Sequence, residues 1–233
     1  MTNKPQLFCF TYAGGNANFF DEIEKDLSGF EIVKPEYAGH GIRHKEPFYN
    51  SFEDLTDDMF TVFQESYNGD SYGLFGYSMG AISVTELLKR ITKNNMPLPD
   101  CVFVAAHEPI PRHELSGYSD DELDDWVKKR TVSFGDVPEK LIKNEVFWRT
   151  YLPVYRADYS LIGKYDFDSI ALRTVIPLVV FYSETDTRLE DMKLWQNYFV
   201  GECEYHCYEG NHFFIKEHHK EMAEVISRKM RVL

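Results

Sequence analysis

The segment that decides the fold is Ser71-Tyr72-Gly73-Leu74-Phe75-Gly76-Tyr77-Ser78-Met79-Gly80. Its apolar and aromatic first half predicts a buried strand over 71–75, and apolar residues recur at helical spacing from Val84 to Ile91. A serine between a strand and a helix, with glycine two positions before and after it, fits the G-x-S-x-G nucleophile elbow. An ordinary strand-to-helix turn would also fit the five residues alone. The strand before and the helix after favour Ser78 as a candidate nucleophile.

Short apolar segments alternate with longer amphipathic ones on both sides of this unit. We expect helices after Ser51, where Ser51-Phe52-Glu53-Asp54 fits a capping box, and over 222–226 near the C-terminus. Strands that alternate with helices are typical of a parallel sheet covered on both faces, so we predict an α/β fold. The expected strands are 6–10, 30–35, 71–75, 101–106, 176–182 and 203–208.

The interval 107–170 is too long for a simple connection between strands. It carries helix signals of its own: the capping box Ser119-Asp120-Asp121-Glu122, Pro138 as a first-turn residue, and helix-compatible residues over 145–151. We interpret it as a helical lid inserted over the C-terminal end of the sheet within a single domain spanning 1–233. The alternative is a surface elaboration without a catalytic role.

The composition excludes several classes of protein. The 233 residues include 38 Asp and Glu against 25 Lys and Arg, a net charge of −13, which disfavours binding to nucleic acid or to anionic membranes. The 18 Phe, 15 Tyr and 3 Trp are too much aromatic surface for a disordered chain. The apolar runs 175–182 and 7–10 are too short for a membrane span and for a signal-peptide core, respectively.

Cys9, Cys101, Cys203 and Cys207 lie mostly within strand-like segments, where free buried thiols are common. We therefore expect a reduced, cytoplasmic protein. Cys203 and Cys207 could be read as metal ligands, but no second Cys/His pair follows at ligand spacing, and we expect no metal.

A serine nucleophile needs a histidine base, which in this kind of fold comes last in the order Ser, acid, His. His212 lies in Glu209-Gly210-Asn211-His212, between the last strand and the last helix, and is our candidate. His40 and His107 precede the preferred acid. Of the others, His44 and His113 lie in polar loops, and His218 and His219 lie on the final helix.

The acid that orients the base is expected at Asp186, which follows the strand 176–182. Glu184 and Asp191 share that loop region and could instead be solvated carboxylates or helix caps. Glu108 follows the earlier strand 101–106 and could reach the same histidine from there.

An oxyanion hole requires two backbone amides, one from the residue after the nucleophile and one from a loop after an early strand. Met79 would supply the first. The loop Tyr12-Ala13-Gly14-Gly15-Asn16, directly after the strand 6–10, would supply the second at Ala13, although a plain turn explains its glycines equally well.

Five segments together resemble the type II thioesterases, stand-alone members of the α/β-hydrolase superfamily that accompany nonribosomal peptide and polyketide synthases. The resemblance covers nearly the whole chain. Tyr77 stands where the family more often has His, and 37–43 replaces a Pro-Gly-Arg-Gly-Arg-like stretch. The segments are Phe10-Thr11-Tyr12-Ala13-Gly14-Gly15, Pro35-Glu36-Tyr37-Ala38-Gly39-His40-Gly41-Ile42-Arg43, Gly76-Tyr77-Ser78-Met79-Gly80, Leu152-Pro153-Val154-Tyr155-Arg156-Ala157-Asp158-Tyr159 and Gly210-Asn211-His212.

The resemblance implies an α/β-hydrolase fold and hydrolysis of acyl or aminoacyl thioesters from the phosphopantetheine arm of carrier proteins, which unloads misprimed or stalled synthases. Ser78 would attack, His212 would take its proton, and the amides of Met79 and Ala13 would hold the oxyanion. The enzyme would need no cofactor, because phosphopantetheine belongs to the carrier protein. A monomer is the simple expectation.

Two other functions fit the same residues. One is a carboxylesterase or a medium-chain fatty acyl thioesterase, because a serine triad does not choose between oxygen and sulfur leaving groups. The other is a non-catalytic binding protein with a hydrolase fold. Because carrier proteins are usually acidic too, we expect docking through a local basic or apolar patch near the insertion. Lys128-Lys129-Arg130 is a candidate, although it could equally be a solvated helix end.

Overall fold

The computed structural model describes residues 3–110, 115 and 117–230. Its centre is a parallel sheet with the strand order β2-β1-β3-β4-β5-β6. The predicted α/β fold is confirmed, and each expected strand is present, with β3 reaching Tyr77, directly before Ser78. The strands are β1 (Gln6–Phe10), β2 (Glu31–Val33), β3 (Tyr72–Tyr77), β4 (Cys101–Ala105), β5 (Leu178–Tyr182) and β6 (Cys203–Cys207).

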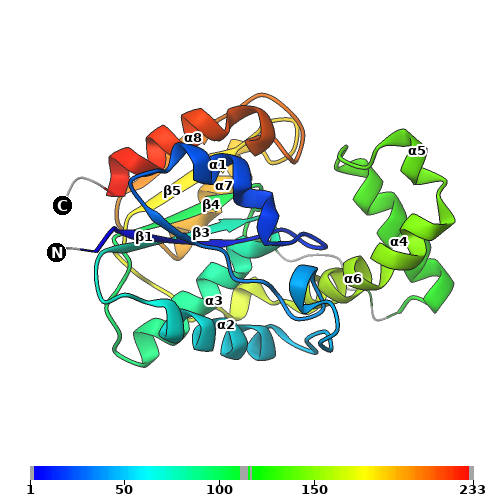
Figure 1. Ribbon diagram of the computed structural model, residues 1–233, viewed down its shortest axis with the longest axis horizontal. Coiled ribbons are helices and arrows are strands. Elements are labelled where there is room, and N and C mark those ends of the chain that lie inside the picture. The colour runs from blue at the N-terminus through cyan, green and yellow to red at the C-terminus, as the bar shows by residue number, and fades with distance from the viewer. Residues whose placement is uncertain (1–2, 111–114, 116, 231–233) are drawn as a thin grey trace.

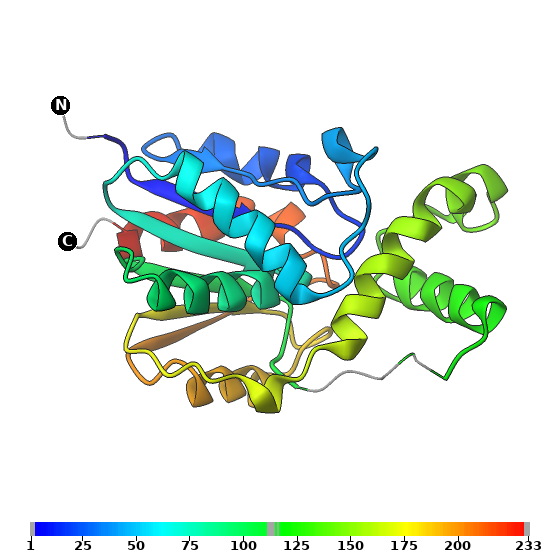
Figure 2. The same cartoon turned by 90° about the horizontal axis from the view of Figure 1, so that it is seen from below.

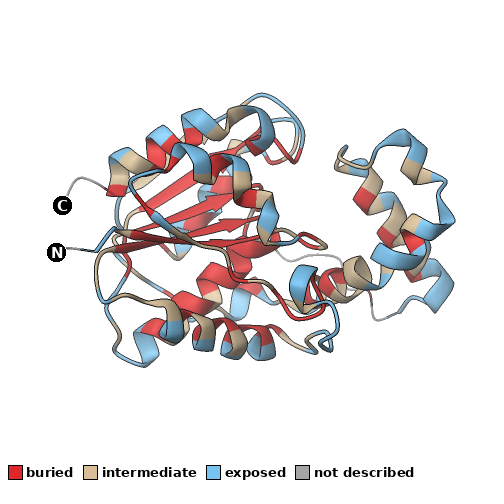
Figure 3. Ribbon diagram, in the orientation of Figure 1, coloured by how far each residue is buried: buried red, intermediate tan, exposed pale blue. Residues whose placement is uncertain are grey.

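Helices cover both faces of the sheet. In Figure 1, α1 (Asp21–Asp26) and α8 (Ile215–Met230) lie on one face, and α2 (Phe52–Ser66) and α3 (Met79–Lys93) lie on the other. The four central strands β1, β3, β4 and β5 are buried between two apolar clusters, and side chains of β1 alternate between these clusters. Figure 3 shows this burial along the strands. The short helix α7 (Leu189–Met192) precedes the last strand, and 3-10 turns occur at Ala17–Phe20, Gly41–Arg43, Phe167–Ser169 and Lys193–Asn197.

The predicted helix starts have the expected capping contacts. The Ser51 hydroxyl accepts a hydrogen bond from the Asp54 amide at the start of α2, at 3.1 Å. At the start of α4 (Asp120–Ser133), Ser119 and Glu122 form both hydrogen bonds of a capping box. These contacts satisfy amides that have no partner within the helix, which is why the sequence marks these boundaries well.

Between β4 and β5 the chain leaves the sheet and forms α4, α5 (Glu139–Ile142) and α6 (Glu145–Lys164). Figures 1 and 2 show these helices beyond one end of the sheet, with α6 leading back to the body. The helix expected over 145–151 is longer in the structure and continues through Pro153 to Lys164. Burial of Trp148, Tyr159 and Ile162 stabilises the longer helix despite the proline. Within the described residues, no helix is long and apolar enough to cross a membrane.

Candidate active site

The turn from β3 to α3 places Ser78 in a strained backbone conformation, with φ 53° and ψ −117°. A Cβ atom on Gly76 would collide with the carbonyl of Gly80, and a Cβ atom on Gly80 would collide with the carbonyl of Phe10. Both glycines are therefore needed for strand and helix to approach closely. The Ser78 amide donates to the carbonyl of Ala105 at 2.8 Å, which holds the turn against β4.

The structure brings the expected nucleophile, base and acid together. Nε2 of His212 lies 3.0 Å from Oγ of Ser78, and Nδ1 of His212 lies 2.8 Å from Oδ2 of Asp186. The carboxylate can only accept, so Nδ1 carries the hydrogen and Nε2 is left to accept the serine proton. Ser78 and His212 are buried, with 8% and 5% of their surface exposed. The arrangement has the contacts that general-base activation of a serine requires.

The backbone around His212 is fixed by hydroxyl groups from neighbouring strands. The buried hydroxyl of Tyr77 donates to the carbonyl of His212 at 2.7 Å. The hydroxyl of Ser183, at the end of β5, donates to the carbonyl of Gly210 at 2.6 Å. These contacts position the base on a loop that would otherwise have few constraints.

The alternative acids lie in other environments. Glu184 is exposed and accepts from the amide of Leu189, and Asp191 pairs with Arg188 at 3.2 Å. Glu108 is partly buried in the wall of a cavity that Asp186 also lines.

Among the other described histidines, His107 is buried, lines the larger cavity at Ser78 and lies with its ring 5.7 Å from that of Phe167. The rest have contacts away from Ser78. His40 pairs with Asp158 at 2.9 Å and His219 with Asp26 at 2.6 Å. His44 donates to the carbonyl of Gly41, which leaves it on a surface turn. His206 lies on β6 beside Glu204, and His218 contacts the carbonyl of Glu209, whereas His113 lies outside the described residues.

The loop after β1 lies beside Ser78, and Ala13 lines the same cavity as Ser78. Gly14 has a φ of 78°, which favours glycine, and the Gly15 amide donates to the carbonyl of Tyr12 at 2.9 Å. Within the described part of the chain, no hydrogen bond uses the amide of Met79 or that of Ala13. Both amides are thus available for a ligand oxygen, as the sequence-based hypothesis requires.

Two cavities meet at Ser78 and His212. The smaller, of about 140 Å³, is lined mainly by aromatic rings, and the larger, of about 370 Å³, lies on the side of Asp186 and Glu108. Burial raises the pKa of Tyr155, in the smaller cavity, to about 12 and raises those of Tyr12 and Tyr159 as well, so these phenols stay neutral. The rings of the smaller cavity are Tyr12, Phe134, Phe147, Tyr155, Tyr159 and Phe213.

Phe134, at the end of α4, lies between the two cavities. Its ring stacks on the imidazole of His212 with a centroid distance of 4.0 Å, and the guanidinium of Arg130 lies 4.3 Å from its centroid. No pattern in the sequence indicates a role for Phe134, because a residue at the end of a helix carries no periodicity signal. The pairing of Asp158 with His40 was not predicted either, although both residues lie in segments that carry the resemblance.

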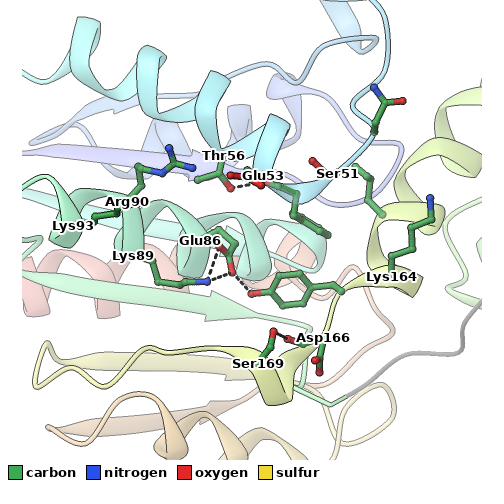
Figure 4. Close-up of a pocket in the computed structure, with 14 residues that line it drawn as sticks. Ser51, Glu53, Thr56, Glu86, Lys89, Arg90, Lys93, Lys164, Asp166 and Ser169 are labelled. Carbon is green, nitrogen blue, oxygen red and sulfur yellow. Dashed lines mark hydrogen bonds and ion pairs between the residues drawn. The ribbon is translucent and has the colours of Figure 1, made fainter.

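A larger polar cavity of about 610 Å³ lies elsewhere, between α2, α3 and the end of α6, and neither Ser78 nor His212 lines it. Figure 4 shows Glu86 of α3 beside Lys89, with which it forms hydrogen bonds. Glu86 also accepts a hydrogen bond from the hydroxyl of Tyr165, the residue that follows α6. These contacts attach the C-terminal end of α6 to the body of the protein. In the described residues, no group of three or more His, Cys, Asp or Glu side chains could hold a metal ion.

The family model described as "Thioesterase domain" matches residues 5–230. The chain belongs to the thioesterase-domain family. It is therefore a hydrolase that acts on thioesters, and the predicted resemblance is confirmed. This membership also disfavours a non-catalytic binding protein.

Individual relatives are similar in sequence to this thioesterase over nearly its whole length. The medium-chain S-acyl fatty acid synthase thioesterase of Rattus norvegicus is 27% identical over 217 residues, covering 90% of this chain and 81% of the relative. The gramicidin S biosynthesis protein GrsT of Aneurinibacillus migulanus is 24% identical over 240 residues, covering 99% and 90%. The crystal structure of ClbQ from the colibactin NRPS/PKS pathway has a TM-score of 0.87 at 22% identity and covers 97% of both chains, which confirms the expected fold.

Proposed function

We propose that this thioesterase is a stand-alone type II enzyme that releases acyl or aminoacyl groups from the phosphopantetheine arm of carrier proteins. The observation that carries the proposal is the position of His212, which lies 3.0 Å from Ser78 and 2.8 Å from Asp186 between two cavities. Support also comes from the family and from relatives such as GrsT, a gramicidin S biosynthesis protein. The role would be to unload misprimed or stalled synthases.

In the first half of the reaction, His212 removes the proton from Ser78 as the serine oxygen attacks the thioester carbonyl carbon. The negative charge that develops on the carbonyl oxygen is stabilised by the amides of Met79 and Ala13. The carbon–sulfur bond then breaks, and His212 gives its proton to the departing phosphopantetheine thiol. Asp186 holds the imidazole in the required tautomer and stabilises its charged form.

In the second half, His212 removes a proton from water, which attacks the acyl-enzyme ester. The same amides stabilise the second oxyanion, and the proton returns to Ser78 as the free acid leaves. No step uses a metal or a bound cofactor, and the phosphopantetheine remains on the carrier protein.

The two cavities suggest where each part of the substrate binds. The smaller, aromatic cavity next to Ala13 suits the acyl group, and its volume of about 140 Å³ favours short chains. The larger cavity beside Asp186 suits the phosphopantetheine arm. Phe134 separates the two paths and covers one side of His212.

The proposed partner is an acidic carrier protein, and the proposed enzyme is a cytoplasmic monomer. Of the candidate docking residues, Lys129 is exposed, Lys128 is partly buried and Arg130 is engaged with Phe134. This patch lies on α4, close to the mouth of the larger cavity, to which Arg130 contributes. We therefore assign docking to α4 through Lys128 and Lys129.

A second candidate is a medium-chain fatty acyl thioesterase. It is favoured by the similarity to the rat medium-chain enzyme. It would place the acyl chain in the larger cavity of about 370 Å³, which has more room for such a chain than the smaller one.

The test compares acetyl-, aminoacyl- and octanoyl-carrier proteins with matched p-nitrophenyl esters as substrates of the wild type and of Ser78→Ala. We expect the wild type to prefer short acyl-carrier substrates, and Ser78→Ala to lose about 10⁶-fold in kcat while its circular dichroism spectrum is unchanged. A preference for octanoyl-carrier would support the second candidate. Faster hydrolysis of all free esters than of carrier thioesters would refute both, and undiminished turnover by Ser78→Ala would refute the assignment of the nucleophile.

A further inference from the structure

Asp158 is a buried carboxylate that the triad does not use. It lies on α6, is 2% exposed, and its Oδ2 accepts two hydrogen bonds from segments far away in the sequence. One comes from the amide of Gly14, at 2.6 Å, and the other from Nε2 of His40, at 2.9 Å. A buried charge of this kind is costly unless it is paired, and here both partners are directed at one oxygen.

His40 is arranged as a cation. Nδ1 lies 3.0 Å from the carbonyl of Ala38 and Nε2 lies 2.9 Å from Asp158, so each ring nitrogen faces an acceptor and must carry a hydrogen. Burial alone lowers the pKa of His40, but the hydrogen bond and the charge of Asp158 outweigh it and raise the pKa above its ordinary value. Asp158 and His40 therefore form a buried ion pair that connects α6 to the loop after β2.

The Gly14 amide belongs to the tight turn that carries the proposed oxyanion donor. Because the carbonyl of Tyr12 and the amide of Ala13 share one peptide plane, the hydrogen bond from Gly15 to the Tyr12 carbonyl sets the direction of the Ala13 N–H. Gly14 is the second of the two central residues of that turn and has a φ of 78°, a conformation that glycine adopts without strain. The hydrogen bond to Asp158 holds this residue in place.

The ring of Tyr155, one turn before Asp158, packs directly over Gly14, where a Cβ atom would collide with it. Helix α6 thus contacts the turn with two inward-facing residues, Tyr155 and Asp158, which lie one helical turn apart. Its C-terminal end is attached to α3 through the hydrogen bond from the Tyr165 hydroxyl to Glu86. The C-terminal half of α6 is therefore a fixed wall of the active site.

We propose that Asp158 is a positioning residue for the oxyanion hole, which fixes the turn at Gly14 so that the Ala13 amide faces the reacting carbonyl, and that His40 holds Asp158 in position. This inference rests on the proposed roles of Ser78 and Ala13. It assigns a function in the chemical step to a lid helix and to a histidine that is remote from the triad. A latch that only kept the insertion folded would not affect the stabilisation of an oxyanion.

The experiment measures p-nitrophenyl acetate hydrolysis and inhibition by 1,1,1-trifluorohexan-2-one, a ketone that adds to the serine and places an oxyanion in the hole. We expect kcat to fall about 10-fold in Asp158→Asn, whose amide oxygen can still accept from Gly14, and about 100-fold in Asp158→Ala, with KM nearly unchanged. The inhibition constant should rise by the same factor as kcat/KM falls, because both report on the tetrahedral state.

His40 provides a rescue test. In His40→Gln the side-chain amide can still donate to Asp158, so we expect it to retain most of the activity, whereas His40→Ala should behave like Asp158→Asn. The matched control is Asp124→Asn, which removes the charge of an aspartate on α4 that pairs with Arg156 of α6 at 3.1 Å. This variant alters the lid without contacting the turn and should keep the wild-type inhibition constant.

The proposal is overturned if Asp158→Asn and His40→Ala keep the wild-type kcat and inhibition constant. It is also overturned if the kcat of Asp124→Asn falls, and its inhibition constant rises, as much as those of the Asp158 and His40 variants. If Asp158→Ala does not fold, Asp158→Asn and the two His40 variants decide the question. Because the ester and the ketone need no carrier protein, these results are independent of the proposed substrate. A wild type that hydrolyses the ester but no carrier thioester would refute the proposed function alone.

Discussion

At the scale of single residues, the site depends on a few side chains whose neighbours decide their chemistry. Asp186 and Glu108 both lie near His212, at the ends of two adjacent strands, and the sequence left both open as the acid. In the structure the 2.8 Å contact from Asp186 to Nδ1 makes it the better candidate. Glu108 lines the larger cavity together with Asp186 and His212.

We expect Asp186→Asn to lower kcat by about 10⁴-fold, because an amide in place of the carboxylate favours the wrong imidazole tautomer. In Glu108→Gln, kcat should fall far less. The measurement is steady-state hydrolysis of p-nitrophenyl acetate by both variants, with thermal unfolding as a check that each is folded. A large loss in Glu108→Gln alone would move the acid to the end of β4.

At the scale of elements, the insertion has two parts with different attachments. Helix α6 is attached to the body by the Asp158–His40 pair, by Tyr155 over Gly14, and by Tyr165 on Glu86. Helix α4 packs on α6 and contacts it through Arg156, which pairs with Asp120 and Asp124. Any opening of the active site should therefore involve α4 and α5, and should carry Phe134 away from His212.

The buried pair also predicts a dependence of stability on pH. Asp158 raises the pKa of His40 in the folded state. The ion pair therefore contributes fully to the free energy of unfolding at pH values below the ordinary histidine pKa of about 6.5. This contribution is lost as the pH rises through the raised pKa of the folded state. Glu36 and the rings of Tyr37 and Phe48 also lie near His40, and Glu36 and Tyr37 belong to its own loop.

Urea unfolding between about pH 6 and about pH 9 measures this effect. We expect the free energy of unfolding of the wild type to decrease relative to that of His40→Gln as the pH rises. Because both proteins contain the other histidines, the difference between their free energies of unfolding removes the contributions of those histidines. Parallel curves for the two proteins would show that His40 does not titrate in this range.

At the scale of the whole molecule, the net charge of −13 acts against an acidic carrier protein at long range. In the proposed complex, attraction would come from short-range contacts, such as those of the basic residues of α4. The repulsion acts over a long range and the contacts of the patch act over a short range, so the dependence of the rate on salt concentration distinguishes the two effects.

We expect kcat/KM for an acetyl-carrier protein to rise several-fold between about 20 mM and about 200 mM NaCl, since added salt screens the repulsion between two acidic proteins. Hydrolysis of p-nitrophenyl acetate, a neutral substrate, should be nearly independent of salt and serves as the control. A steep decrease with salt for the carrier substrate would show that attraction between opposite charges dominates the encounter.

The amino-acid sequence by itself determined the order of strands and helices, the elbow at Ser78 and the loops that carry His212 and Ala13. These features depend on local patterns: apolar periodicity, capping residues, and glycines at positions that only glycine tolerates. The parallel topology then places the strand ends at one edge, so that the triad candidates could be named in order.

Only the tertiary structure decided which side chains meet across long separations. The contact of Asp186 with His212, the stacking of Phe134 on His212, and the contact of Asp158 with Gly14 each join segments that no local pattern relates. The extent of α6 beyond Pro153 also followed from burial against other elements and not from helix propensity. Such contacts depend on how the insertion packs on the sheet, and that packing is a property of the whole chain.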